Sequence, residues 1–126
     1  MLYAILCYHD EAEVDSWSKE KDDAVLAKRA QVTDPLAAQG KLGPVARLMP
    51  TTAATTVRSG REPLVIDGPF AETKEQLLGF YLVDCATLEE AIDIARGLGR
   101  DETGGFEIRP LRLFQPAAFP SPAFIE

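Results

Sequence analysis

The fold of this chain is decided by the stretch Asp67-Gly68-Pro69-Phe70-Ala71-Glu72-Thr73-Lys74-Glu75 and the apolar run Leu77-Leu78-Gly79-Phe80-Tyr81-Leu82-Val83 that follows it. A short apolar strand, Leu64-Val65-Ile66, precedes the stretch and ends in the acid Asp67. The connection between the two strands is dense in charged side chains. Loops held between rigid strands are where binding and catalytic residues usually lie. The sequence therefore predicts two core strands joined by a loop that carries a candidate site.

The composition is that of one globular domain. The chain has 126 residues, of which 46% are hydrophobic and 26% are charged, and this length can bury a core. The formal net charge is −7 and the basic residues are not clustered, so we expect no direct nucleic-acid partner. The N-terminus lacks the basic region and cleavage site of a signal peptide, and no apolar run is long enough to span a membrane. We therefore expect a cytoplasmic protein that does not enter the membrane.

The chain has two cysteines, Cys7 and Cys85, and both fall in apolar strand patterns. Two cysteines are too few for a disulfide scaffold, and their spacing matches no metal motif. We expect both to be small buried side chains, which favours a reducing, cytoplasmic environment. The cluster around His9 and its neighbouring acids also lacks the spacing of zinc ligands, so we expect no metal and no cofactor.

Apolar periodicity and turn residues divide the chain into alternating strands and helices. A helix is expected from about Ser16 to Gln31, and Pro35 either kinks it or opens a second short helix. Thr87 and Glu90 form a capping box at the start of a later helix that Gly97 and Gly99 end. The strands are expected at residues 2–9, 43–48, 55–58, 64–66, 77–84 and 106–114. Residues 10–15 are acidic and expected to be solvated, and residues 49–54 are expected to be a loop.

This order is that of an α+β, ferredoxin-like βαββαβ subunit with an extra hairpin. In that topology the first strand lies beside the strand at residues 77–84 and runs antiparallel to it. The pairing separates Cys7 from Cys85 by about 20 Å, so a disulfide between them is not expected. Gly79 in the middle of its strand indicates close approach by another group. Pro110 places the last strand at an edge or a bulge.

Both central strands are apolar on both faces, whereas two helices can cover only one face of the sheet. The other face would expose a large apolar surface, which usually marks an interface. A second copy packed sheet against sheet covers it most simply. The pattern therefore predicts a homodimer.

The segment from Asp67 to Leu77, together with Gly79-Phe80-Tyr81-Leu82, resembles the signature of the DGPF branch of the YCII-related proteins. The similarity covers residues 1–114, which we predict to be one domain, and leaves residues 115–126 as a C-terminal tail. The resemblance implies a dimeric α+β barrel from the bacterial cytosol. Some related proteins are similar to small lyases and isomerases that use a His–Asp pair. Others accompany extracytoplasmic-function sigma factors, which implies a sigma factor as a possible partner. The histidine of the YCII-type enzymes lies on the first helix, whereas this chain has its only histidine, His9, at the end of the first strand.

Asp67 is the candidate general base, because burial at a strand end would raise the pKa of a carboxylate. It could equally cap the turn at Gly68 and Pro69. His9 is the candidate partner for proton transfer or a polar strand end. The candidate ligand-binding residues, each of which could instead serve packing or surface ion pairs, are Phe70, Glu72, Lys74 and Tyr81.

Two functional hypotheses follow. The first is a non-catalytic dimer with a small-ligand pocket and a regulatory role. The alternative is a cofactor-independent lyase or isomerase that acts on a small cyclic or carbonyl compound by acid–base catalysis.

Overall fold

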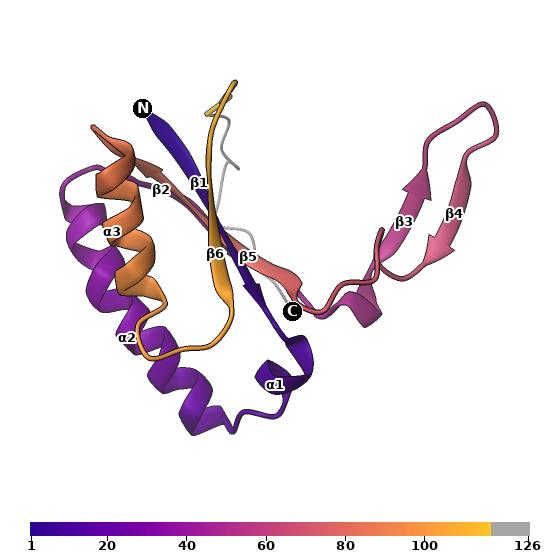
Figure 1. Cartoon of the computed structure of the whole chain (residues 1–126), viewed down its shortest axis with the longest axis horizontal. Helices are drawn as coiled ribbons and strands as arrows, with labels where there is room; N and C mark the ends of the chain where they lie inside the picture. Colours follow the sequence, from indigo (N-terminus) through magenta and orange to yellow (C-terminus); the bar gives the residue numbers. More distant parts are fainter. Residues whose placement is uncertain (117–126) are drawn as a thin grey trace.

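The computed structural model describes residues 1–116, and its centre is a four-stranded antiparallel sheet in the order β2-β5-β1-β6 (Figure 1). This arrangement confirms the predicted α+β, ferredoxin-like fold. Residues 117–126, and with them most of the predicted tail, lie outside the described residues, so the domain boundary at residue 114 stays a prediction. The elements are β1 (Leu2–His9), α1 (Glu11–Asp15), α2 (Lys19–Ala38), β2 (Leu42–Arg47), the short 3-10 helix η1 (Thr51–Ala53), β3 (Thr55–Arg58), β4 (Leu64–Asp67), β5 (Gln76–Asp84), α3 (Leu88–Leu98) and β6 (Gly105–Pro110).

The two central strands, β1 and β5, pair along their whole length, with Leu2 opposite Asp84 and Cys7 opposite Gly79. Cys85 therefore lies beside Met1, whose carbonyl accepts its backbone N–H, at the other end of β1 from Cys7. Both cysteines are buried and free, as predicted. A Cβ atom on Gly79 would stand 2.6 Å from the carbonyl oxygen of Ala46 on β2. The close approach predicted at this glycine is thus confirmed.

One face of the sheet packs against α2 and α3, and the core lies between these layers (Figure 1). Side chains alternate along a strand, so Tyr3 and Ile5 of β1 point to this face with their partners Val83 and Tyr81 of β5. Both helices contribute to the core, and Val32 and Leu36 of α2 pack against it. The buried core residues of α3 are Ala91, Ile94, Ala95 and Leu98.

The helix α2 is one continuous element that contains Pro35. The predicted end near Gln31 and the alternative of a second helix were therefore wrong. The proline lies within the last turn, where it removes only one intrahelical hydrogen bond near an end that already has unpaired groups. Ser18 caps the start by accepting the N–H of Lys21 at 3.0 Å, two residues later than predicted.

The acidic segment after β1 forms a short helix, α1, none of whose residues is buried. Asp10 caps it by accepting the N–H of Ala12 at 3.0 Å. The carboxylate of Glu11 accepts hydrogen bonds from the backbone N–H of Thr51, at 2.8 Å, and from the Thr51 hydroxyl. This contact joins α1 to η1. The helix η1 forms within residues 49–54, which were predicted to be a loop. Long-range contacts of this kind leave no periodic signal in the sequence.

The helix α3 begins at the predicted cap, where Thr87 accepts the N–H of Glu90 at 3.2 Å. The Glu90 carboxylate reaches back to the N–H of Ala86, one residue before the cap. Gly97 does not end the helix but lies inside it, where a Cβ atom would approach Val32 of α2 within 3.1 Å. The glycine therefore lets the two helices pack closely. Leu88, the first residue of the helix, is 48% exposed.

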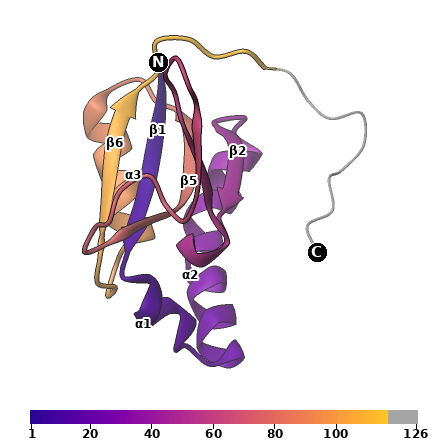
Figure 2. The same ribbon diagram turned by 90° about the vertical axis from the view of Figure 1, so that its right-hand side faces the viewer.

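A two-stranded ribbon made of β3 and β4, residues 55–67, stands away from the sheet on the side opposite to the helices (Figures 1 and 2). We call it the arm. It is the predicted hairpin, and its sequence connects β2 to β5. Its large apolar side chains are exposed in the single chain, namely Val57, Leu64, Val65 and Ile66.

The last strand, β6, is an edge strand that ends at Pro110, four residues earlier than the predicted strand. The edge position agrees with the missing amide proton of proline. Within the described residues, no helix is long and apolar enough to cross a membrane.

Gly104, before β6, is expected to tolerate no side chain. Its φ is +92°, and a Cβ atom would lie 2.4 Å from the carbonyl oxygen of Tyr8 and 3.0 Å from the His9 ring. Gly104→Ala should lower the free energy of unfolding by about 1–3 kcal/mol, measured by urea denaturation. Gly60→Ala is the control, because nothing lies within 4 Å of a Cβ atom there. Equal stability of the two variants would contradict the prediction.

Candidate functional site

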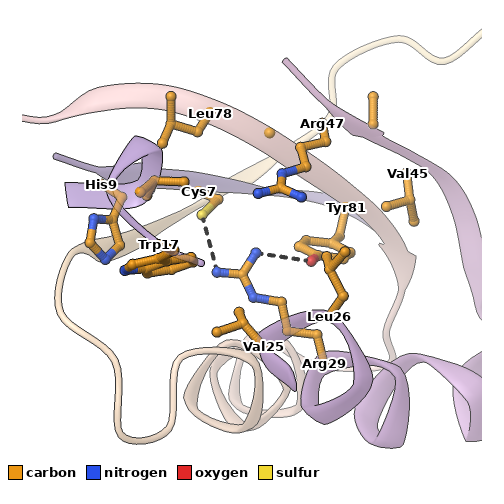
Figure 3. Close-up of a pocket in the computed structure, with 13 residues that line it drawn as sticks. Cys7, His9, Trp17, Val25, Leu26, Arg29, Val45, Arg47, Leu78 and Tyr81 are labelled. Carbon is orange, nitrogen blue, oxygen red and sulfur yellow. Dashed lines mark hydrogen bonds between the residues drawn. The ribbon is translucent and has the colours of Figure 1, made fainter. Parts of the chain in front are cut away.

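A cavity of about 110 Å³ lies between α2 and the helix-facing side of β1, β2 and β5 (Figure 3). It forms because α2 stands off the end of the sheet where β1 runs into α1. Apolar side chains line much of its wall, among them Trp17, Val25 and Leu78. Five polar or titratable side chains also line it, namely Cys7, His9, Arg29, Arg47 and Tyr81.

Arg29 is the central polar group of the cavity. It lies one turn after Val25 on the face of α2 that points at the sheet, so the helix carries its guanidinium to β1 and β5. Its Nη2 donates to Glu102 Oε1 at 2.8 Å, and its Nη1 donates to the hydroxyl of Tyr81 at 3.3 Å. The Glu102 side chain is 7% exposed and the Arg29 side chain 15%. The guanidinium also lies over the ring of Phe106, with 5.6 Å between its Cζ atom and the ring centroid.

Burial by itself disfavours the charged form of Arg29, but the hydrogen bond with Glu102 and the interactions with Tyr81 and Cys7 together outweigh it, and the pKa of Arg29 is raised. Arg29 is therefore a permanent cation within the protein. A buried charge is costly unless it is paired, and Glu102 supplies the pairing. The arginine thus holds α2, β5 and the turn before β6 together at the back of the cavity.

Cys7 lies on β1, with its Sγ atom 3.8 Å from Nη2 of Arg29. Burial raises the pKa of the Cys7 thiol, and the nearby guanidinium only partly offsets this effect. The thiolate is the nucleophilic form of cysteine, so a raised pKa leaves Cys7 a weak nucleophile at neutral pH. Cys7 is therefore a small, weakly reactive side chain in the wall of the cavity.

Arg47 enters the cavity from β2, on the side opposite to Arg29 (Figure 3). Asp22 of α2 accepts from both of its terminal nitrogens, at 3.0 Å and 2.5 Å. This hydrogen-bonded ion pair raises the pKa of Arg47 and lowers the pKa of Asp22. It also ties the first turn of α2 to the edge strand β2.

His9 lies at the closed end of the cavity and is 3% exposed. Its Nδ1 is 3.3 Å from the carbonyl oxygen of Asp10, and its Nε2 is 3.1 Å from the hydroxyl oxygen of Thr103. The same hydroxyl lies 3.1 Å from the carboxylate of Glu13. Both ring nitrogens are thus occupied by protein groups. The histidine fastens the end of β1 to α1 and to the loop before β6.

Trp17 closes the cavity beside His9, and the two rings meet edge to face with centroids 5.6 Å apart. Its Nε1 is buried and has no hydrogen-bond partner among the described residues. Trp17 is the one tryptophan of the chain. Its fluorescence therefore reports directly on this cavity.

The structure brings two of the candidate residues from the sequence, His9 and Tyr81, into this cavity. Asp67 lies elsewhere in the chain, exposed at the end of β4 in the arm, opposite Thr55. Its side chain makes no hydrogen bond to any residue in the described part of the chain. Within one subunit Asp67 and His9 are therefore not a pair.

The remaining candidates lie on the loop that returns from the arm to β5. Phe70 is 71% exposed, and its ring lies under the guanidinium of Arg58, with 5.0 Å between the Cζ atom and the ring centroid. Glu72 and Lys74 are exposed on the same loop. Among residues 1–116, no group of three or more His, Cys, Asp and Glu side chains is placed to hold a metal ion.

Sequence reasoning missed the two arginines. Arg29 follows Val25 by four residues in an otherwise charged helix, and this spacing was the available signal for its position. Nothing in the sequence near Arg47 distinguishes it from a surface charge. The cavity depends on contacts between residues up to 73 positions apart, as between Arg29 and Glu102.

Two comparisons place the chain among known proteins. A family model described as the YCII-related domain matches residues 1–115. The chain is also 57% identical over 124 residues to an uncharacterized protein of Rhizobium meliloti (strain 1021), with 96% of this chain and 100% of that protein covered.

The pairing of Asp22 with Arg47 makes a pH-dependent contribution to stability. The pKa of Asp22 is lowered in the folded state, so the contribution is present above the unfolded-state pKa of about 3.9 and is lost as the pH falls below it. Asp22→Asn should therefore cost about 1 kcal/mol or less at pH 7, since the pair is partly exposed, and a smaller amount at pH 2–3, where protonation of Asp22 weakens the pair. Urea denaturation of both proteins at the two pH values measures the difference. A cost that stays the same at low pH would contradict the prediction.

Proposed function

The chain belongs to the YCII-related family, and from this membership and the geometry above we propose that it acts as a homodimer that binds a small molecule in the cavity beside α2 of each subunit. The observation that carries the proposal is the cavity itself. It is mostly apolar, it is walled by rigid elements, and a few polar groups converge on it, as is usual for small-ligand sites.

The dimer is supported by the face of the sheet that the helices leave uncovered (Figure 2). The alternation along β1 and β5 directs to this face the apolar side chains of Leu6, Tyr8, Phe80 and Leu82. The arm adds further exposed apolar residues on the same side. Isolated two-stranded ribbons are only marginally stable in water, so the arm gains most from a partner surface. Two copies packed through these faces make the dimeric α+β barrel that the family resemblance implies.

The arrangement favours ligand binding over catalysis. A general base needs a free nitrogen or oxygen that faces its substrate. Both nitrogens of His9 are engaged by Asp10 and Thr103, and Asp67 lies outside the cavity. Cys7 is a thiol of raised pKa. In this account the polar groups fix the cavity and orient its occupant.

The alternative is a cofactor-independent lyase or isomerase. One observation favours it, because His9 and Tyr81 line the same cavity. Turnover of a small cyclic or carbonyl compound that disappears in His9→Gln but persists in Asp67→Asn would support this alternative. The regulatory role and the sigma-factor partner rest on the resemblance to the DGPF branch, and a pull-down with an extracytoplasmic-function sigma factor tests them.

Filling the cavity should abolish ligand binding. Fragments of one ring or less, screened against the purified protein, are expected to change the fluorescence of Trp17, which lines the cavity. Val25→Phe places a larger side chain in the same wall and should weaken the binding of every such fragment at least about tenfold. Val57→Phe in the arm is the matched control and should leave binding unchanged. The proposal fails if no fragment binds, or if the fragments bind Val25→Phe as tightly as the unmodified protein.

A further inference from the structure

The charged side chains that line the cavity are opposite in sign to the net charge of the protein. The chain has a net charge of −7, yet no described acidic residue lines the cavity, and two arginines do. The carboxylates that pair with these arginines, Glu102 and Asp22, are not among the lining residues. The charged side chains that line the cavity are therefore both guanidiniums, each paired with a carboxylate that is not part of the lining.

The two guanidiniums repel each other across the cavity. Arg29 comes from α2 and Arg47 from β2, on opposite walls (Figure 3). The charge of Arg29 disfavours the protonated form of Arg47 and by itself would lower the pKa of Arg47. The ion pair with Asp22 has the larger effect, so the pKa of Arg47 is raised. An anion placed between the two arginines would relieve this repulsion. No cation in the cavity would do so.

Hydrogen-bond donors remain available for such an anion. An arginine has five N–H groups, and Asp22 takes one from each terminal nitrogen of Arg47, so three are left. The hydroxyl of Tyr81 accepts from Arg29, so its own proton is left to donate. Charge-assisted bonds from arginine to a carboxylate are among the stronger hydrogen bonds in proteins.

The size and the walls of the cavity limit the rest of the ligand. A volume of about 110 Å³ is somewhat below the roughly 150 Å³ of an apolar protein cavity known to hold benzene. Trp17, Leu26 and Leu78 offer apolar contact. A bare inorganic anion would leave these walls without a partner, whereas a neutral ring would leave the arginines without one.

We propose that the cavity takes a small organic monocarboxylate, whose carboxylate lies between Arg29 and Arg47 within reach of the Tyr81 hydroxyl and whose apolar part, no larger than one ring, packs against Trp17. The assignment rests on the proposed ligand-binding function and adds the chemical class of the ligand. Arg47 is the principal anchor, because its side chain is half exposed and keeps three donors, whereas Arg29 is fixed by Glu102 and Tyr81.

The test compares benzoate with benzamide, which has nearly the same shape but no charge, and with inorganic phosphate. Binding to the full chain is followed by Trp17 fluorescence and by calorimetry. Benzoate should bind at least about tenfold more tightly than benzamide, and more tightly than phosphate. Arg47→Met should reduce benzoate binding at least about tenfold and leave benzamide binding unchanged. Arg100→Met, at an exposed arginine after α3, should change neither.

The outcomes separate the ligand class from the function. Equal binding of benzoate and benzamide, or benzoate binding that survives Arg47→Met, overturns the anion assignment but leaves the cavity a ligand site. Phosphate as the tightest probe overturns the organic part of the assignment. Other fragments that bind in the cavity while benzoate does not also overturn it. If neither these probes nor any fragment binds, the proposed function fails with it.

Discussion

The structure depends on one constraint, which is that the paired strands β1 and β5 are apolar on both faces. The hydrophobic effect requires each face to be removed from water, and the two long helices in the described part of the chain can cover only one face. These helices cover the side that carries Tyr3, Ile5 and Val83. The opposite side, with Leu6 and Phe80, is left for another surface. Both proposed properties of the protein, the ligand cavity and the dimer, arise from how these two faces are covered.

On the helix side the cover is incomplete near the end of β1. The helix α2 carries Arg29 toward the sheet at a position where a closely packed layer would have an apolar side chain. A buried arginine needs its hydrogen bonds satisfied, and Glu102 and Tyr81 satisfy them. The space that this network occupies, together with the turn at Trp17, keeps α2 off the sheet and leaves the cavity. The cavity is thus a consequence of burying a charge in a small core.

Much of the fold could be predicted from the sequence because its signals are local. The apolar runs at residues 2–9 and 77–84, the turn residues around the arm and the cap at Thr87 each specify their own element. Together they led to the correct topology. The errors and omissions lie where distant contacts decide local structure. The helix α1 is held by Asp10 and by the contact of Glu11 with Thr51, and Pro35 is tolerated because it lies in the final turn of α2.

The candidate site was less predictable than the fold, for the same physical reason. The dense loop from Asp67 to Glu75 has a distinctive sequence, but it belongs to the arm and its return, away from the cavity. The cavity instead gathers residues from β1, α1, α2, β2 and β5, and only His9 and Tyr81 among them were predicted to be site residues. The distinctive loop and the exposed arm lie on the side where we place the second subunit. We therefore interpret that segment as part of the interface between copies rather than as part of the ligand site.

The most direct test of this account is the mass of the protein in solution, measured by sedimentation equilibrium at micromolar concentration. The account predicts twice the 13.8 kDa of one chain, reduced to a single folded copy by Leu6→Lys on the uncovered face but not by Leu88→Lys, an equally polar change on the exposed surface of α3. Circular dichroism would verify that each variant remains folded. An unmodified protein that sediments as one well-folded copy would contradict the account, because residues 1–116 of a single chain leave the second face of the sheet uncovered.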